Sequence, residues 1–508
     1  MQQSYFRAIS DRLLGALRGS EVLTLFLEAE QSDFVRFNQA KVRQAGSVTQ
    51  GMLSLDLIDS GKHAPARYTL TGDLEDDVAR GRALLSDLRA TLGFLPEDPH
   101  LLFATEVQST ERIDSNVLPD SATMVDAILE AGADLDMVGI LAAGPVMRGF
   151  ANSLGQFNWF ESSSFNFDWS LYHRADKAVK CGYADTRWDD AELLRKMQEG
   201  ARQLDVMKLD ARTIDPGRYR VYLSPSALGE IVSLLSWGGF GLKEQKTKRS
   251  PLLRAAEGRA QLDARVSMRE NVAGGIAPGF SCSGFLRPDS VSLFEGGQLT
   301  GSLVSPRSAK EFGIATNGAS PHESPDSIEL DAGDTARDSL LAELDTGLWI
   351  NNLWYLNYSD RSSARMTGMT RFATFWVENG EIVAPLDVMR FDDTIYRMMG
   401  EGLVGLTAER ELIMDPGTYG GRSTSSARLP GALVDDFVLS TRSLLLSDDN
   451  PDDVDGIGLH SCGVCGFEIE GPRDEPAHVA DHRKLTATTT STTCRFPLEM
   501  AEDAGNPR

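Results

Sequence analysis

Cysteine, histidine and long apolar runs are all scarce in this chain. Its 508 residues include five cysteines and seven histidines. An odd and scattered set of cysteines argues against a disulfide scaffold and favours a reducing compartment. The longest apolar run, residues 137–144, falls far short of the roughly 20 residues that a membrane helix needs. Charges interrupt the apolar pattern of residues 5–17, which does not fit a signal peptide. We therefore expect a cytoplasmic protein with no membrane partner.

Positive charge is also in short supply. The formal net charge is −24 and the isoelectric point is about 4.7. Proteins that bind nucleic acids need a basic surface for phosphate contacts, so we expect no nucleic-acid partner. Apolar residues make up 41% of the chain, which is typical of a globular protein. The length is sufficient for two or three domains with a large buried core.

The first 212 residues mix helical and strand-like patterns. Apolar side chains recur at helical spacing in residues 6–17, and residues 23–28 then alternate as a strand would. Aromatic residues crowd the strand-like stretch 145–173, and we interpret them as core or subunit interface rather than as a ligand site. Further strands are predicted at 34–42 and 52–58, and further helices at 73–92, 120–132 and 189–204. We predict an α+β fold, with an N-terminal domain over residues 1–110 and a central domain over 111–212.

A β-hairpin is predicted around residues 372–384. β-Branched and aromatic residues precede Asn379-Gly380, a dipeptide that supplies the positive φ angles of a tight hairpin turn. Both faces of the two predicted strands are apolar. Two-sided apolarity predicts that the hairpin is covered on both sides and does not lie at a solvated edge.

This hairpin and its surroundings resemble a known family. Residues 349–360 and 365–428 closely resemble the C-terminal domain of the TldD/PmbA family, whose members are subunits of zinc metallopeptidases. The likeness extends over about residues 20–439. It implies a C-terminal domain over residues 213–439 that is larger than the N-terminal domain and consists mainly of antiparallel strands.

The zinc motif of the family is absent from this chain. In catalytic subunits of the family, one helix carries His-Glu-x-x-x-His, and a cysteine near the C-terminus completes the site. The matching segment here, residues 223–239, contains no histidine. Between residues 213 and 439, His322 is the only histidine and Cys282 the only cysteine. The chain therefore resembles the PmbA (TldE) type, and we expect no catalytic residue and no cofactor in its main domains. Glu230 is left as a lone carboxylate, expected to be solvated or in the first helical turn.

Five residues of the predicted C-terminal domain are candidates for lining a cleft. Paired carboxylates such as Asp392 and Asp393 can serve as general acid and base in a stand-alone hydrolase. Their neighbours Arg390 and Arg397 favour a salt-bridged structural network instead. The five cleft candidates are Trp237, Arg365, Arg371, Asp392 and Asp393.

Residues 440–508 form an acidic, threonine-rich tail. Within its segment 460–483, Cys462, Cys465, His478 and His482 have the spacing of a two-cysteine, two-histidine zinc finger. Two prolines interrupt the part that should become helical. Structural zinc and a disordered tail therefore remain open alternatives.

Together these features predict a cytoplasmic TldD/PmbA-type subunit of a heteromeric metallopeptidase assembly that acts in proteolysis and peptide maturation. Its expected partners are a motif-bearing TldD-like paralogue, which supplies the chemistry, and a peptide or small-protein substrate. Two alternatives are a binding adaptor that acts through the zinc-finger-like tail and a stand-alone hydrolase with a different site.

Overall fold

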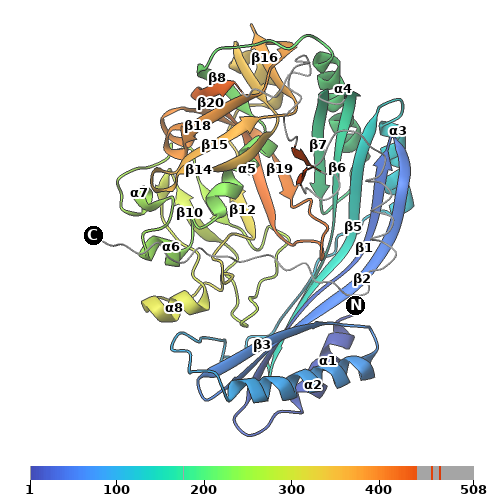
Figure 1. Cartoon of the computed structure of the whole chain (residues 1–508), viewed down its shortest axis with the longest axis vertical. Coiled ribbons are helices and arrows are strands. Elements are labelled where there is room, and N and C mark those ends of the chain that lie inside the picture. Colours follow the sequence, from blue (N-terminus) through green and yellow to red (C-terminus); the bar gives the residue numbers. More distant parts are fainter. Residues whose placement is uncertain (1, 175–176, 443–458, 462–467, 471–508) are drawn as a thin grey trace. The chain divides into compact units, whose positions relative to one another are not determined.

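The computed structural model describes residues 2–174, 177–442, 459–461 and 468–470. The chain divides into two units, Met1–Ser443 and Leu444–Arg508. In the second unit, β21 (Leu459–Ser461) pairs antiparallel with β22 (Glu468–Glu470). All other described elements belong to the first unit, which combines helices with two large sheets and has the expected α+β fold (Figure 1).

The first sheet has seven strands, and long antiparallel hairpins dominate it. Its order is β3-β2-β1-β5-β6-β4, with β7 also paired to β6. β1 pairs with β5, so residues on either side of position 110 share one sheet. The strands are β1 (Val22–Asn38), β2 (Lys41–Asp59), β3 (Lys62–Thr69), β4 (Thr110–Ile113), β5 (Met137–Asn152), β6 (Phe157–Arg174) and β7 (Lys177–Asp185).

Four helices cover this first sheet. α1 (Gln3–Leu14) and α2 (Leu74–Leu92) share a core with β1 and β2 and lie beside β3 in Figure 1. α3 (Ser121–Ala131) and α4 (Asp190–Met207) pack on the other half of the sheet. Asp73, Asp120 and Asp189 cap the last three helices with their side chains, because the carboxylate accepts hydrogen bonds from otherwise unpaired backbone N–H groups.

The second sheet has thirteen strands, and its main path is β11-β10-β9-β12-β20-β8-β13-β16-β17. β18 and β19 pair with β20, while β15 joins β18 to β14. Its strands are β8 (Gly217–Leu223), β9 (Met268–Glu270), β10 (Val291–Glu295), β11 (Gln298–Leu299), β12 (Ser327–Leu330), β13 (Gly347–Ile350), β14 (Leu353–Asp360), β15 (Arg365–Thr370), β16 (Thr374–Glu378), β17 (Glu381–Pro385), β18 (Met389–Thr394), β19 (Leu403–Met414) and β20 (Ser426–Arg442).

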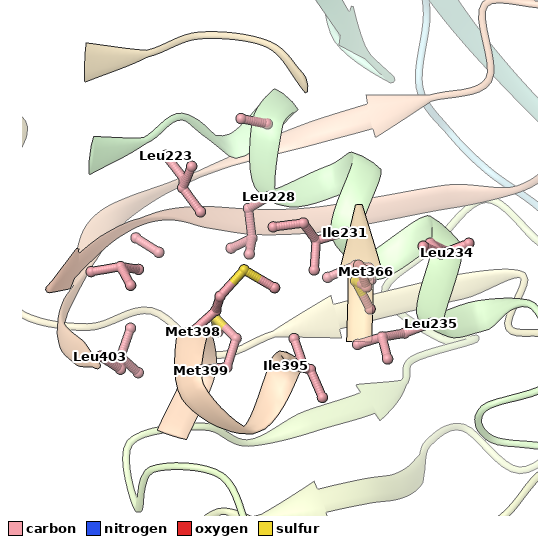
Figure 2. Packing of buried hydrophobic residues seen from close by; sticks show 14 of the residues in the cluster. Leu223, Leu228, Ile231, Leu234, Leu235, Met366, Ile395, Met398, Met399 and Leu403 are labelled. Carbon is pink, nitrogen blue, oxygen red and sulfur yellow. The ribbon is translucent and has the colours of Figure 1, made fainter. Parts of the chain in front are cut away.

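The core of this half lies beneath α5 (Pro225–Ser236). Leu228, Ile231 and Leu235 on one face of α5 point toward Met366 and Met398 (Figure 2). The shorter helices are α6 (Leu242–Lys246), α7 (Leu253–Ala256), α8 (Pro306–Phe312) and α9 (Leu340–Leu344). In the described part of the chain, none of the helices has the length and apolarity to cross a membrane.

The predicted hairpin is present, with one correction. Asn379 and Gly380 have φ angles of 53° and 78° and connect β16 to β17, as the sequence predicts. β16 is buried on both faces, except at its last residue and in part at Trp376. β17, however, lies at the end of the main path, and Glu381 and Val383 are exposed. The expectation that the whole hairpin avoids a solvated edge is therefore wrong for β17.

Candidate functional site

α5, the helix that the sequence resemblance aligns with the family's zinc-bearing helix, lines a cavity. α5 begins at Pro225, and the Ser224 side chain caps it by accepting a hydrogen bond from the Ala227 N–H. While one face of α5 packs into the core, the opposite face, which includes Glu230 and Ser233, lines a cavity of about 410 Å³. We call it the α5 cavity.

The other walls of the α5 cavity come from both sheets. β6 contributes Asp168, β7 contributes Lys180, and β19 contributes Glu411. Glu411 is engaged by ion pairs with Lys196 (2.6 Å) and Arg337 (3.6 Å). The cavity therefore lies where the two sheets of the first unit meet, and distant parts of the sequence form it together.

Two carboxyl groups of the α5 cavity are electrostatically perturbed. Burial raises the pKa of Asp168, and Lys180 and a hydrogen bond from Asn166 (3.1 Å) only partly offset that rise. Glu230 opens onto the cavity, where desolvation by surrounding protein atoms raises its pKa, with Lys180 acting in the opposite direction. Raised pKa values and a shared cation occur both in functional sites and in structural networks. Glu230 is exposed, as expected, but it lies in the middle of α5 and not in its first turn.

The donor set of the α5 cavity does not fit a catalytic zinc ion. Zinc sites of that type use three protein ligands, mostly histidine, cysteine or carboxylate side chains. In the described residues, no three His, Cys, Asp or Glu side chains come together in a way that could hold a metal ion. Ser233 faces the cavity, whereas its neighbour Leu234 is buried in the core. We therefore derive no metal-dependent step for this chain.

Three of the predicted cleft residues lie on or near β14 and β15. Trp237 follows α5 and is 63% exposed, and the Arg361 guanidinium stacks 5.2 Å from its ring centroid. Arg365 pairs with Asp392 at 2.7 Å. Arg371 stacks on Trp354 at 4.3 Å. These three residues make cation–π and ion-pair contacts at an exposed surface. None of them is among the residues that line the α5 cavity.

Asp392 and Asp393 do not face one another as an acid–base pair. They are consecutive residues of β18, so their side chains point to opposite faces of the sheet. Asp392 is half-buried against Arg365. Asp393 is only 3% exposed and pairs with Arg397 at 2.6 Å. The two carboxylates therefore serve separate ion pairs.

The structure does not place the predicted tail ligands, and it shows cavity residues that the sequence did not indicate. Cys462, Cys465, His478 and His482 lie outside the described residues. Sequence reasoning missed Asp168 and Lys180, which lie on strands β6 and β7, far from α5 in the chain. The sequence drew attention only to Glu230, because the resemblance places it on the helix that carries the zinc motif in catalytic subunits of the family.

Comparisons with known proteins agree with the resemblance seen in the sequence. Residues 216–441 match the family model described as the PmbA/TldA metallopeptidase C-terminal domain. No curated protein matches the chain. The fold is similar to TldE from Thermococcus kodakarensis, with 11% identity and a TM-score of 0.69, over 86% of this chain and 100% of that one.

Two further solved structures share the fold. Both are described as putative modulators of DNA gyrase, one from Thermotoga maritima and one from Bacteroides thetaiotaomicron. Each is 15% identical to this chain and covers 86% of it, with TM-scores of 0.66 and 0.68 over 100% and 98% of their own chains. At these identities the structural likeness supports the fold alone, and the family model itself matches residues 216–441.

Proposed function

We propose that this chain is the non-catalytic subunit of a cytoplasmic peptidase assembly of the TldD/PmbA family, the metallopeptidase-related group whose C-terminal domain model matches residues 216–441. Its partner is a paralogue that carries the His-Glu-x-x-x-His motif and supplies the zinc chemistry. The substrate is a peptide or a small protein.

The observation that carries this proposal is the α5 cavity. α5 keeps its cap, its buried face and its cavity-lining face, yet the donors that a zinc peptidase needs do not converge there in the described residues. A non-catalytic subunit needs its fold to present a surface to the partner. It does not need zinc ligands, because the partner supplies the chemistry. Separation of Asp392 from Asp393 also removes the pair on which a stand-alone hydrolase would depend.

The test is co-expression of this chain with a motif-bearing paralogue from the same genome. We expect affinity capture of one to recover the other, and peptide cleavage only in the presence of the motif-bearing subunit. Replacing the glutamate of the partner's motif with glutamine should abolish cleavage, while Glu230→Gln in this chain should leave turnover measurable. Peptide cleavage by this chain alone, or the absence of a complex, would contradict the proposal.

A further inference from the structure

A second cavity, of about 640 Å³, is lined by four arginines, which are Arg67, Arg148, Arg287 and Arg422. One wall is a face of the first sheet, with Phe26, Met52, Arg67 and Arg148. The opposite wall comes from loops of the C-terminal half, including residues 419–425. We call it the arginine cavity. The hydrogen bonds and ion pairs that each charged side chain already makes indicate which ligand the cavity prefers.

Arg148 is buried but incompletely paired. It lies on β5 and is 7% exposed. Its Nη1 donates to the carbonyl oxygens of Met147 (2.9 Å) and Ala29 (3.4 Å). Glu28 is the nearest carboxylate, 3.8 Å from Nε, and its side chain is half-exposed. Within the described residues, Nη2 donates no hydrogen bond. Since burying a charged group with unused donors is costly, a ligand oxygen at this position would be stabilising.

Arg422 brings a second buried cation to the same cavity. It is 6% exposed, and it donates to the carbonyl oxygens of Gly144 (2.8 Å) and Ser164 (2.7 Å). In the part of the chain that is described, no carboxylate lies within ion-pair distance of it. Burial lowers its pKa to about 10, so it stays charged at neutral pH. Glu30, the acid that interacts with it, already accepts hydrogen bonds from Ser32 and Gln50.

The other charged groups differ in how far they are already paired. Arg67 is exposed at the rim and has no ion pair among the described residues. Arg287, in contrast, forms ion pairs with Glu270 and, at 2.7 Å, with Asp326. The lining contains four arginines and three acids, which are Glu28, Glu30 and Asp326. Because Arg287 is already paired with two acids, the groups available to an anion are Arg67 and the unused donors of Arg148.

The uncharged lining suits an anion with an apolar body. Gly420 and Gly421 line the cavity in the 419–425 loop, with φ angles of 77° and 148° that favour glycine. Hydroxyl groups of Ser423 and Thr424 follow them. Guanidinium, hydroxyl and glycine backbone groups are the usual partners of carboxylate and phosphate oxygens. Phe26, Met52 and Phe280 line the same cavity with apolar surface.

We propose that the arginine cavity binds the carboxylate or phosphate group of a ligand that also carries an apolar body. The anionic group contacts Arg148 and Arg67, and the apolar body packs on Phe26 and Phe280. This site does not depend on the proposed role in a peptidase assembly.

The test is isothermal titration calorimetry on the full chain with N-acetyl-phenylalanine, its amide, phenyl phosphate and inorganic phosphate. Binding of an acid probe without binding of the amide supports the proposal, and comparing the carboxylate with the phosphates identifies the source. Arg148→Gln and Arg67→Gln should each weaken the bound probe, Arg148→Gln by about tenfold or more. The control Arg43→Gln, on an exposed part of β2 outside the cavity, should change nothing.

A second variant keeps the proposal testable if Arg148→Gln does not fold. Glu28 competes with a ligand for Arg148, and its side chain is half-exposed, so Glu28→Gln should fold and bind the acid probe more tightly. A merely structural arginine would not produce that gain. Equal binding of acid and amide, no binding of any probe at millimolar concentration, or unchanged affinity in Arg67→Gln and Glu28→Gln would overturn the proposal.

Discussion

At the scale of single residues, the adjacent aspartates of β18 form a natural matched pair. Asp393 is 3% exposed, pairs with Arg397 and accepts a hydrogen bond from the Val438 N–H. Removing one partner of a buried ion pair leaves an uncompensated charge, so we expect Asp393→Ala to lower the free energy of unfolding by about 3 to 5 kcal/mol.

The neighbouring position supplies the control for this prediction. Asp392 pairs with Arg365, whose side chain is 48% exposed, and exposed pairs contribute at most about 1 kcal/mol. Asp392→Ala should therefore be nearly neutral in urea denaturation. Equal losses of unfolding free energy in the two variants would show that the two carboxylates contribute equally to stability.

These two residues also show where sequence reasoning stops. The sequence predicts that arginines accompany the two aspartates, and it predicts ion pairs over catalysis. It could not predict which aspartate is buried, because that depends on how β20 pairs with β18. Asp168, Lys180 and Glu230 were beyond prediction as a group, since three separate elements bring them to the α5 cavity.

At the scale of elements, local signals predicted helices better than strands. Helix α2 begins after Asp73 as expected, because capping is a local interaction. The predicted separate strands at 23–28 and 34–42 are instead one strand, β1, which ends at Asn38 before a turn at Gln39 and Ala40 with positive φ angles. The edge position of β17 likewise depends on long-range strand order, which alternation of side chains does not encode.

The turn between β16 and β17 permits a direct test. Gly380 has a φ angle of 78°, a conformation in which a β-branched residue is strained. We expect Gly380→Val to lower stability by about 1 to 3 kcal/mol, visible as a lower melting temperature. Gly380→Asn is the matched control, because asparagine tolerates positive φ, and it should retain most of the stability. An unchanged melting temperature for the valine variant would contradict the role assigned to this turn.

At the scale of the whole first unit, a histidine connects segments that are distant in sequence. His63 on β3 contacts Asp56 on β2 at 3.0 Å and Asp98 at 3.4 Å. Asp98 in turn pairs with Arg307 of α8 at 2.6 Å. The hydrogen bond with Asp56 is the main reason that the pKa of His63 is raised. The chain of contacts links the first sheet to the C-terminal half and should respond to pH.

The raised pKa fixes the sign of that response. A folded-state pKa above the unfolded value of about 6.5 means that stabilisation by His63 is complete below that pH. It is lost as pH rises through the folded-state pKa. We expect His63→Gln to be more destabilising at pH 6 than at pH 9 in urea denaturation. His173→Gln, at an exposed position on β6, should show no such difference. A loss for His63→Gln that is equal at both pH values would contradict the pH response.

The last prediction concerns metal content and the tail. β20 continues to Arg442, so a truncation that spares the second sheet ends after Ser443. We expect residues 1–443 to purify without stoichiometric zinc, because the described residues bring no suitable ligand group together. If Cys462, Cys465, His478 and His482 bind zinc, the full chain should contain one ion per molecule.

Cobalt substitution distinguishes that site from adventitious metal, because thiolate ligation gives a tetrahedral spectrum that Cys465→Ser should abolish. Zinc in the truncated chain would contradict the assignment of the α5 cavity as unsuited to metal.

Partner capture gives the second readout. The truncated chain should still recover the motif-bearing paralogue, since the family match ends at residue 441. Loss of capture on truncation would favour the adaptor function over the peptidase-subunit function.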